Sequence, residues 1–264
     1  MEEKEVIYYE DELNDEFSGT KIDSKIIDEK FKYKKSIIWE LFSSIIQNFL
    51  SMPIKVLYLK FKFNHKFIGK EKIKQYKKDG LFIYANHTQN FADTFIPSLA
   101  IYPKRNFLIV NPENISLKGT GWLVELLGAI PIPSTINASK KFLEQIELRV
   151  NKKQSITVYP EAHIWPYYTK IRNFKSVSFR YPVEFNKPAF SITNTYKKEK
   201  NKIKMISYID GPFYPDATDE KGNELSKKDK IQNLRDKIYN SMVENSKNNT
   251  YEKIIYKKKT KVEE

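Results

Sequence analysis

The stretch LFIYANHTQNFAD, residues 81–93, decides the fold class of this chain. Its first five residues form an apolar run of the aliphatic and aromatic side chains that are typical of a buried strand. The ionisable residues His87 and Asp93 follow where that run ends. Ligands of open α/β sheets bind beyond the carboxyl ends of the strands, so this order predicts a strand followed by a site loop.

A second stretch, SITVYPEAH at 155–163, has the same organisation, because Glu161 and His163 follow the apolar run SITVY. The chain has only three histidines, and two of them stand at strand ends with a carboxylate close by in sequence. This arrangement indicates a catalytic site. The simpler alternative is structural: Asp93 caps a helix, His87 is a buried hydrogen-bonded residue and Glu161 braces a loop.

From residue 80 onward, strand-like and helix-like segments alternate, which predicts an α/β fold with a mostly parallel sheet covered by helices. We expect strands at 81–85, 106–110, 129–132, 155–159, 189–193 and 204–209, and helices at 94–101, 116–127, 138–152 and 227–245. The expected organisation is an acidic, loosely structured lead-in at 1–35 with a short strand at 6–9, an amphipathic helix at 36–59, a catalytic domain at 60–245 and a basic, frayed or surface-bound tail at 246–264.

The amphipathic helix is predicted by residues 36–51, where apolar side chains recur in pairs every four positions. They cover an arc of about 220°, and serine, glutamine and asparagine fill the other side. We expect this helix to end near Pro53. An apolar arc of this width either packs on the protein's own core or lies in a membrane interface. The lysines that follow within and after it favour the interface; they are Lys55, Lys60, Lys62 and Lys66.

The composition excludes several kinds of site. With no cysteine among 264 residues, the chain has no disulfide, no thiolate zinc site and no cysteine nucleophile. Hydrophobic residues make up 40% and aromatic residues 14% of the chain, which indicates a folded protein with a sizeable core. The acidic start predicts no cleavable signal peptide, and the longest uncharged stretch, 41–54, is too short to predict a transmembrane span.

The formal net charge of +13 is unevenly distributed, because residues 1–16 hold eight acids and one lysine. Only five of the 46 basic residues are arginines. The lysine excess is either an ordinary solvated surface or a source of attraction to anionic lipid headgroups. The chain lacks the arginine-rich motif with interleaved aromatics that base-reading surfaces favour, so nucleic acid is not an expected partner.

The order of these blocks resembles that of the glycerolipid acyltransferase family, which includes the 1-acyl-glycerol-3-phosphate acyltransferases. The family's first block is Asn-His-x4-Asp, and NHTQNFAD at 86–93 matches it with one additional residue between His87 and Asp93. Its third block, Phe-Pro-Glu-Gly-Thr-Arg, corresponds to YPEAHI at 159–164. The remaining correspondences are LGAIPIPS at 127–134 for the second block and KPAFSIT at 187–193 for the fourth. The resemblance covers residues 65–210.

The resemblance implies that His87 is the general base on an acceptor hydroxyl, that Asp93 supports it, and that Glu161 is the glutamate of the third block. The phosphate-binding arginines of the family correspond here to Ser134 and Ile164, so another cation has to supply the charge. The side chains expected to contact the substrate are Ser134, Glu161, His163, Lys170, Arg172 and Lys175, with Lys140 as a further source of charge. The cationic residues at 170–175 are otherwise an ordinary solvated surface.

We therefore expect an O-acyltransferase that acts on a lysophosphatidate-like acceptor in phospholipid synthesis. The resemblance implies acyl-CoA or acyl carrier protein as the thioester donor, and neither a metal nor an organic cofactor. The expected location is the cytoplasmic face of a membrane with anionic lipid. Two alternatives stay open: a non-catalytic lipid-binding relative, and a metal-dependent hydrolase with His87, Asp93, Glu161 and His163 as ligands.

Overall fold

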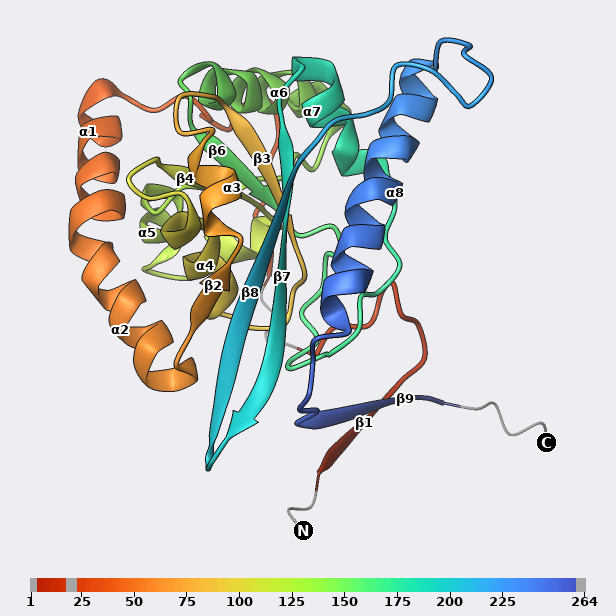
Figure 1. Ribbon diagram of the computed structural model, residues 1–264. Coiled ribbons are helices and arrows are strands. Elements are labelled where there is room, and N and C mark those ends of the chain that lie inside the picture. Colours follow the sequence, from red (N-terminus) through yellow and green to blue (C-terminus); the bar gives the residue numbers. More distant parts are fainter. Residues whose placement is uncertain (1–3, 18–22, 260–264) are drawn as a thin grey trace, which may run out of the picture.

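The computed structural model describes residues 4–17 and 23–259 and contains a seven-stranded sheet in the order β2-β8-β7-β3-β6-β4-β5 (Figure 1). Its strands are β2 (Lys66–Ile68), β3 (Leu81–Ala85), β4 (Asn106–Val110), β5 (Ala129–Pro131), β6 (Ser155–Val158), β7 (Ala189–Glu199) and β8 (Lys202–Phe213). Neighbouring strands are parallel except for β7 and β8, which form a long antiparallel hairpin. The expectation of a mostly parallel α/β sheet is confirmed.

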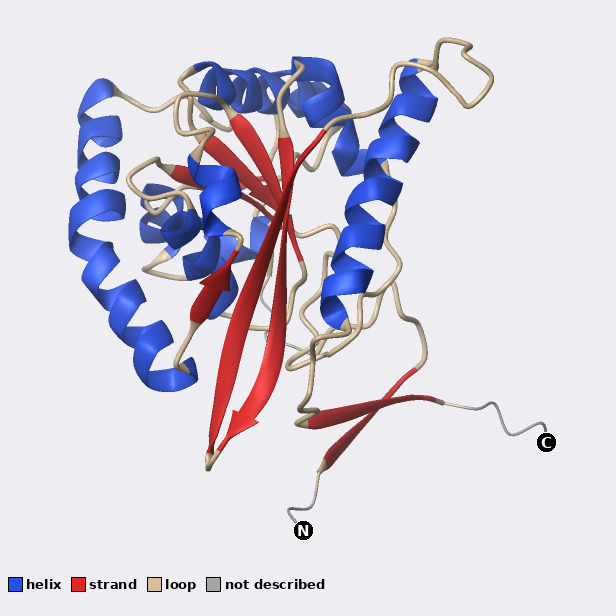
Figure 2. Ribbon diagram, viewed as in Figure 1, coloured by secondary structure: helices blue, strands red, loops and turns tan. Residues whose placement is uncertain are grey.

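Helices cover both faces of this sheet (Figure 2). They are α1 (Ile37–Ile45), α2 (Ser51–Phe63), α3 (Lys70–Lys74), α4 (Ala92–Ala100), α5 (Gly121–Leu126), α6 (Ile136–Asn151), α7 (Arg180–Phe185) and α8 (Lys227–Ser246), with 3-10 turns at Pro112–Ile115 and Val177–Phe179. Side chains alternate along a strand, so β3 contributes to two cores. Phe82 and Tyr84 pack with α6 and α8, whereas Leu81 and Ile83 pack with α2 and α4. A strand covered on both faces is apolar throughout, which explains the run LFIYA.

The N-terminal helix is longer than expected and runs from Ile37 to Phe63 through α1, a π-helical turn at Ile46–Leu50 and α2. The expectations that it ends near Pro53 and that its region ends at 59 are wrong. Proline lacks the amide hydrogen that a regular helical turn requires, and the wider π turn just before it lets the helix continue. By length and composition the whole helix could cross a membrane, although its longest uncharged stretch is short.

This helix packs on the domain through its polar side. Ser43, Gln47 and Lys55 are buried, and their neighbours Leu59 and Phe63 enter the core only in the last turns. Each of the following apolar side chains is more than half exposed: Ile37, Ile38, Leu41, Phe42, Phe49, Leu50, Ile54 and Phe61. The alternative in which the apolar arc packs on the protein's own core is therefore wrong. The reason is that the domain presents polar partners here, since Leu126 O accepts hydrogen bonds from Ser43 and Gln47.

The two ends of the described chain are ordered against each other. Strand β1 (Glu5–Tyr9) pairs in parallel with β9 (Ile254–Lys258) in a separate two-stranded sheet. The short strand expected at 6–9 is present, and its pairing with β9 corrects only the frayed alternative for the tail. The described residues 10–17 and 23–35 of the expected lead-in form no helix or strand. Residues 1–3, 18–22 and 260–264 of those two expected regions lie outside the described residues.

Candidate active site

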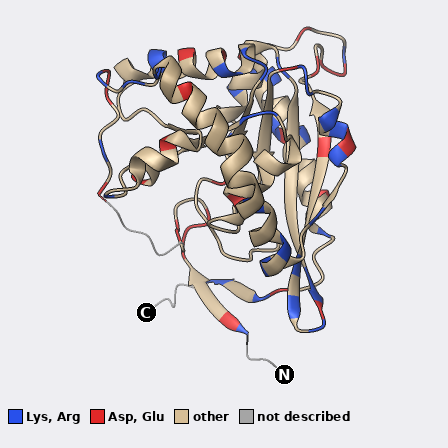
Figure 3. Ribbon diagram, turned by 90° about the vertical axis from the view of Figure 1, so that its left-hand side faces the viewer, with Lys and Arg blue, Asp and Glu red and all other residues tan. Residues whose placement is uncertain are grey.

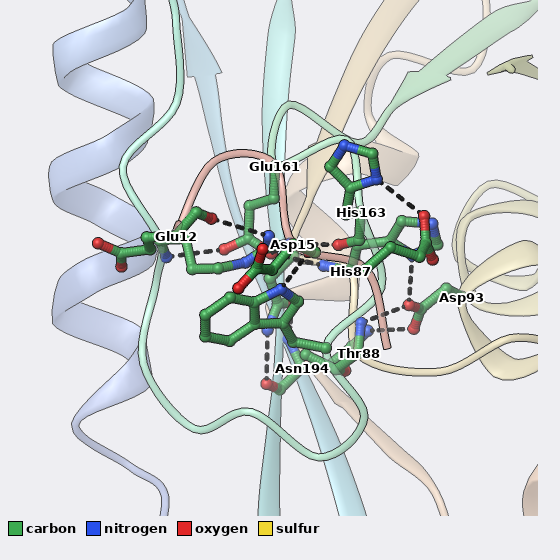
Figure 4. A network of polar contacts seen from close by, with 12 residues as sticks. Glu12, Asp15, His87, Thr88, Asp93, Glu161, His163 and Asn194 are labelled. Atoms are coloured by element: carbon green, nitrogen blue, oxygen red, sulfur yellow. Dashed lines mark hydrogen bonds and ion pairs between the residues drawn. The ribbon is translucent and has the colours of Figure 1, made fainter. Parts of the chain in front are cut away.

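His87 and Asp93 meet at the end of β3, as the spacing requires if the histidine precedes the helix (Figure 4). His87 lies in the turn between β3 and α4, and Asp93 is in the first turn of α4. The Nδ1 atom of His87 lies 2.9 Å from Oδ2 of Asp93. The same oxygen accepts hydrogen bonds from the backbone N–H groups of Thr88 and Gln89, at 2.7 and 2.8 Å. The turn with its additional residue thus wraps around the carboxylate and keeps the pair together.

The imidazole of His87 is fixed on one side and open on the other. Its ring stacks on Tyr159 with 4.3 Å between centroids, and its backbone carbonyl accepts a hydrogen bond from the N–H of Trp165. The His87 side chain is 16% exposed, whereas Asp93 is fully buried. Within the described residues, Nε2 of His87 has no hydrogen-bond partner. With Nδ1 facing a carboxylate, Nε2 is the nitrogen that can take a proton from a bound hydroxyl.

Glu161 braces the site loop instead of facing a substrate. It is 4% exposed, and its two oxygens accept hydrogen bonds from the backbone N–H groups of His87 and Arg172, both at 2.9 Å. Burial raises the pKa of Glu161, while the positive charge of Arg172 acts in the opposite direction. The expected substrate contact of Glu161 is therefore corrected to the bracing role, because backbone donors already occupy its carboxylate.

Arg172 is likewise inside the protein. It is 1% exposed, with its guanidinium 3.5 Å from Glu161 and 4.8 Å from the ring centre of Trp165. It also donates to the backbone carbonyls of His163 and Glu12. Its Nε has no hydrogen-bond partner within the described residues, but this atom is buried as well. Because the whole side chain is inside the protein, the expected phosphate contact of Arg172 is wrong.

The other expected substrate residues lie at the surface. Lys140, Lys170 and Lys175 are exposed. Ser134 is also exposed, and its hydroxyl accepts a hydrogen bond from the N–H of Ile27, which docks the segment before α1 onto β5. The structure gives none of these four side chains a contact with His87 or Asp93, so their role as substrate contacts stays a prediction.

His163 lies in the loop of the third block, and its Nδ1 is 2.8 Å from Oε2 of Glu16 (Figure 4). Both side chains are partly exposed. The N-terminal segment that carries Glu16 runs along this loop, where the carbonyl of Asp15 accepts a hydrogen bond from Trp165 Nε1 at 2.8 Å. Sequence reasoning missed this segment, because nothing local to residues 11–17 signals a contact with residues some 150 positions away.

The ligand set of the metal-dependent alternative does not converge. Glu161 and His163 turn to the partners just described, and no three His, Asp or Glu side chains in residues 4–17 and 23–259 are grouped to hold a metal ion. The structure therefore does not support a metal-dependent hydrolase built on these four residues.

Comparison with known proteins agrees with the blocks found in the sequence. The family model described as Acyltransferase matches residues 64–208. Among solved structures, the 1-acyl-sn-glycerophosphate (LPA) acyltransferase PlsC from Thermotoga maritima is similar, with a TM-score of 0.50, 18% sequence identity and 81% of each chain covered. At this identity the likeness concerns the fold. A search of curated proteins found no match. Because the family model spans more than half of the chain and contains both site loops, this protein belongs to the acyltransferase family.

Proposed function

We propose that this protein transfers a fatty acyl group from a thioester to the hydroxyl of a lysophosphatidate-like glycerolipid precursor in phospholipid synthesis. The observation that carries the proposal is the buried Asp93 carboxylate on Nδ1 of His87, with the His87 side chain partly exposed and its Nε2 without a hydrogen-bond partner among residues 4–17 and 23–259. A carboxylate in this position holds the imidazole in the tautomer that accepts a proton at Nε2 and stabilises the imidazolium that results.

The chemical step follows from that geometry. Nε2 of His87 takes the proton of the acceptor hydroxyl as its oxygen attacks the thioester carbonyl, and a carbon–oxygen bond forms. The tetrahedral intermediate then collapses, the carbon–sulfur bond breaks, and the imidazolium returns its proton to the leaving thiolate. Coenzyme A or acyl carrier protein would be that thiol, and the step requires neither a metal nor an organic cofactor.

The exposed apolar side of the helix Ile37–Phe63 supports a position at a membrane surface. The helix is anchored to the domain by its polar side, so only its outer face is free to enter a lipid interface. Lysines near its C-terminal end, Lys60, Lys62 and Lys66, are exposed and suit an anionic leaflet. We place this surface at the cytoplasmic side, where acyl-CoA and acyl carrier protein are found.

The acceptor headgroup needs a test of its own. Ser134 and Ile164 stand where the family has phosphate-binding arginines, and Arg172 is buried. A phosphate would have to rely on the exposed Lys140, Lys170 or Lys175. An acceptor panel of 1-acyl-glycerol 3-phosphate, monoacylglycerol and lysophosphatidylcholine, compared at equal concentration, separates a phosphate-selective site from one that binds an uncharged or zwitterionic headgroup.

The catalytic role is tested by His87→Ala and Asp93→Asn. Release of free thiol from palmitoyl-CoA measures transfer, and the absence of cysteine means that the protein itself gives no background. We expect His87→Ala to lower kcat by about 10²–10⁴-fold, because the general base is removed. Asp93→Asn should lower kcat by a comparable factor, because the carboxylate that holds the imidazole in the required tautomer is removed. Unfolding curves of the variants serve as the control for folding. Unchanged turnover in His87→Ala would refute the assignment, and no turnover of the wild type with any acceptor would leave lipid binding as its role.

A further inference from the structure

A row of polar side chains leads from the His87–Asp93 pair across β7 and β8 to the residue before β2. Asn194 on β7 lies opposite Ser207 on β8, and Ser207 lies beside Phe67 on β2. Nδ2 of Asn194 donates to Oδ1 of Asp93 at 3.2 Å. Ser207 Oγ donates to Oδ1 of Asn194 at 2.5 Å, and Nε2 of His65, one residue before β2, lies 2.8 Å from the same hydroxyl.

Each hydrogen bond in this row has only one possible direction. The Asp93 carboxylate accepts, so the amide of Asn194 must present its NH₂ group to it and its oxygen to Ser207. The single hydroxyl hydrogen of Ser207 is then used, so His65 must donate through Nε2. Burial and the charge of Lys70 lower the pKa of His65 to about 4, and the ring is therefore neutral near pH 7 with its hydrogen on Nε2.

The row is buried and doubly anchored. Asn194 is 1% exposed, and Ser207 and Asp93 are fully buried. The backbone of Asn194 is held separately, because the side chain of Asn86 accepts from its N–H at 2.8 Å and donates to its carbonyl at 3.1 Å. The residue before the catalytic histidine thus fixes the strand from which Asn194 reaches Asp93.

We infer that Asn194 is a positioning residue for acyl transfer, and that Ser207 acts through Asn194 by holding its amide in the one orientation that donates to Asp93. This inference rests on the proposed function, in which Asp93 orients His87. Of the hydrogen bonds to the Asp93 carboxylate, the one from Asn194 is the only one to Oδ1 that the structure describes. Without it the carboxylate can rotate away from the plane in which it meets Nδ1 of His87.

The test is a double-mutant cycle on kcat with palmitoyl-CoA and 1-oleoyl-glycerol 3-phosphate as substrates. We expect Asn194→Ala to lower kcat about tenfold, since hydrogen bonds to charged groups are the strong ones, and Ser207→Ala to lower it by a smaller factor. The double variant should have the kcat of Asn194→Ala alone, because we infer that Ser207 affects the His87–Asp93 pair only through the side chain of Asn194. The KM for palmitoyl-CoA should change by less than about twofold, since no substrate contact is removed.

Thr193→Val is the matched control. Thr193 is fully buried on the same strand, and its hydroxyl has no hydrogen-bond partner in the described part of the chain. Its removal should leave kcat unchanged. All rates are divided by the fraction of folded protein. If Asn194→Ala folds poorly, the kcat of Ser207→Ala, which deletes only one oxygen, still tests the proposal.

The outcomes separate the two proposals. Full kcat in Asn194→Ala together with an inactive His87→Ala overturns the positioning role and leaves the proposed function in place. Losses that multiply in the double variant, or a kcat lost equally in Thr193→Val, also overturn it, because they indicate general damage to the strand. An active His87→Ala overturns the proposed function itself.

Discussion

At the scale of single residues, Ala162 shows how the site loop is made. Its φ of 64° lies in the left-handed region, which costs a residue with a Cβ atom about 1–2 kcal/mol. This turn, closed by hydrogen bonds from Ala162 N to Tyr159 O and from His163 N to Glu161 O, lets Glu161 reach back to His87. The family pattern that the sequence resembles has glycine at this position, where the strain would be absent.

We therefore predict that Ala162→Gly stabilises the protein by about 0.5–1 kcal/mol, the relief of strain being partly offset by the greater freedom of glycine in the unfolded chain. For a chain of this length that corresponds to a rise in Tm of about 1–3 °C. Differential scanning calorimetry checks it. Ala138→Gly, in α6, should lower Tm instead, and a lower Tm in Ala162→Gly would show that the turn carries no strain.

At the scale of elements, a glutamate adds to the contacts of Ser43 and Gln47 that orient α1. Glu40 accepts two hydrogen bonds from Arg149 of α6, at 2.8 and 2.5 Å, and one at 2.9 Å from Arg105, just before β4. Burial alone would raise the pKa of Glu40, but the hydrogen bonds and charges of Arg149 and Arg105 lower it to about 2. Two arginines on different elements thus hold the polar side of the helix against the domain and leave its apolar side outside.

This lowered pKa predicts an acid-sensitive helix. The ordinary pKa of Glu40 is 4.5, so its ion pairs contribute full stability above that pH and lose it as pH falls from 4.5 toward 2. The contribution is on the order of 3 kcal/mol. Urea unfolding at pH 6, 4 and 3 should show a smaller loss of stability in Glu40→Gln than in the wild type. Glu244→Gln, which alters an exposed pair with Lys247, should follow the wild-type curve, and identical curves for all three proteins would contradict the prediction.

At the scale of the whole molecule, the helix Ile37–Phe63 forms one flank of the domain (Figure 1). The view onto that flank shows a helix with few charged residues along most of its length (Figure 3). The hairpin of β7 and β8 extends beyond the other strands of the sheet, toward the end of the molecule at which β3 ends and His87 follows (Figure 1). The β1–β9 pair lies at the same end (Figure 1). The last turns of α2 pack on α4, which carries Asp93, so a lipid surface at the flank would be close to the end of the sheet that carries the site.

We predict that Phe42→Asp combined with Phe49→Asp abolishes binding to vesicles that contain phosphatidylglycerol. These side chains are 57% and 67% exposed, and each buried phenylalanine contributes about 2 kcal/mol, so partitioning should fall by about 100-fold or more. Vesicle co-sedimentation measures it. Ile136→Asp, which changes a side chain 90% exposed on α6, should bind as the wild type does. Equal loss in this control would assign binding to net charge instead of to the helix.

The sequence by itself determined six of the seven strands of the main sheet and the central pair of the site, but not β2 or the antiparallel pairing of β7 with β8. Both follow from local information: an apolar run long enough to be buried on both faces specifies β3, and a histidine and an aspartate on either side of a helix start can meet only in the turn between them. Asn194 was not predicted as part of the site, because it lies just past the expected strand 189–193 and its partners on β8 and α4 are distant in sequence.

Only the tertiary structure decided which side of the N-terminal helix faces the domain, that Arg172 is internal, and that residues 11–17 lie along the site loop. An amphipathic pattern specifies two sides but not their surroundings. Arg105 and Arg149, which bind the polar side of the helix through Glu40, lie 65 and 109 positions from that residue in sequence. No local pattern encodes contacts at such separations. The physical reason is that a buried charge follows its hydrogen-bond partners, and these are brought together only when the chain has folded.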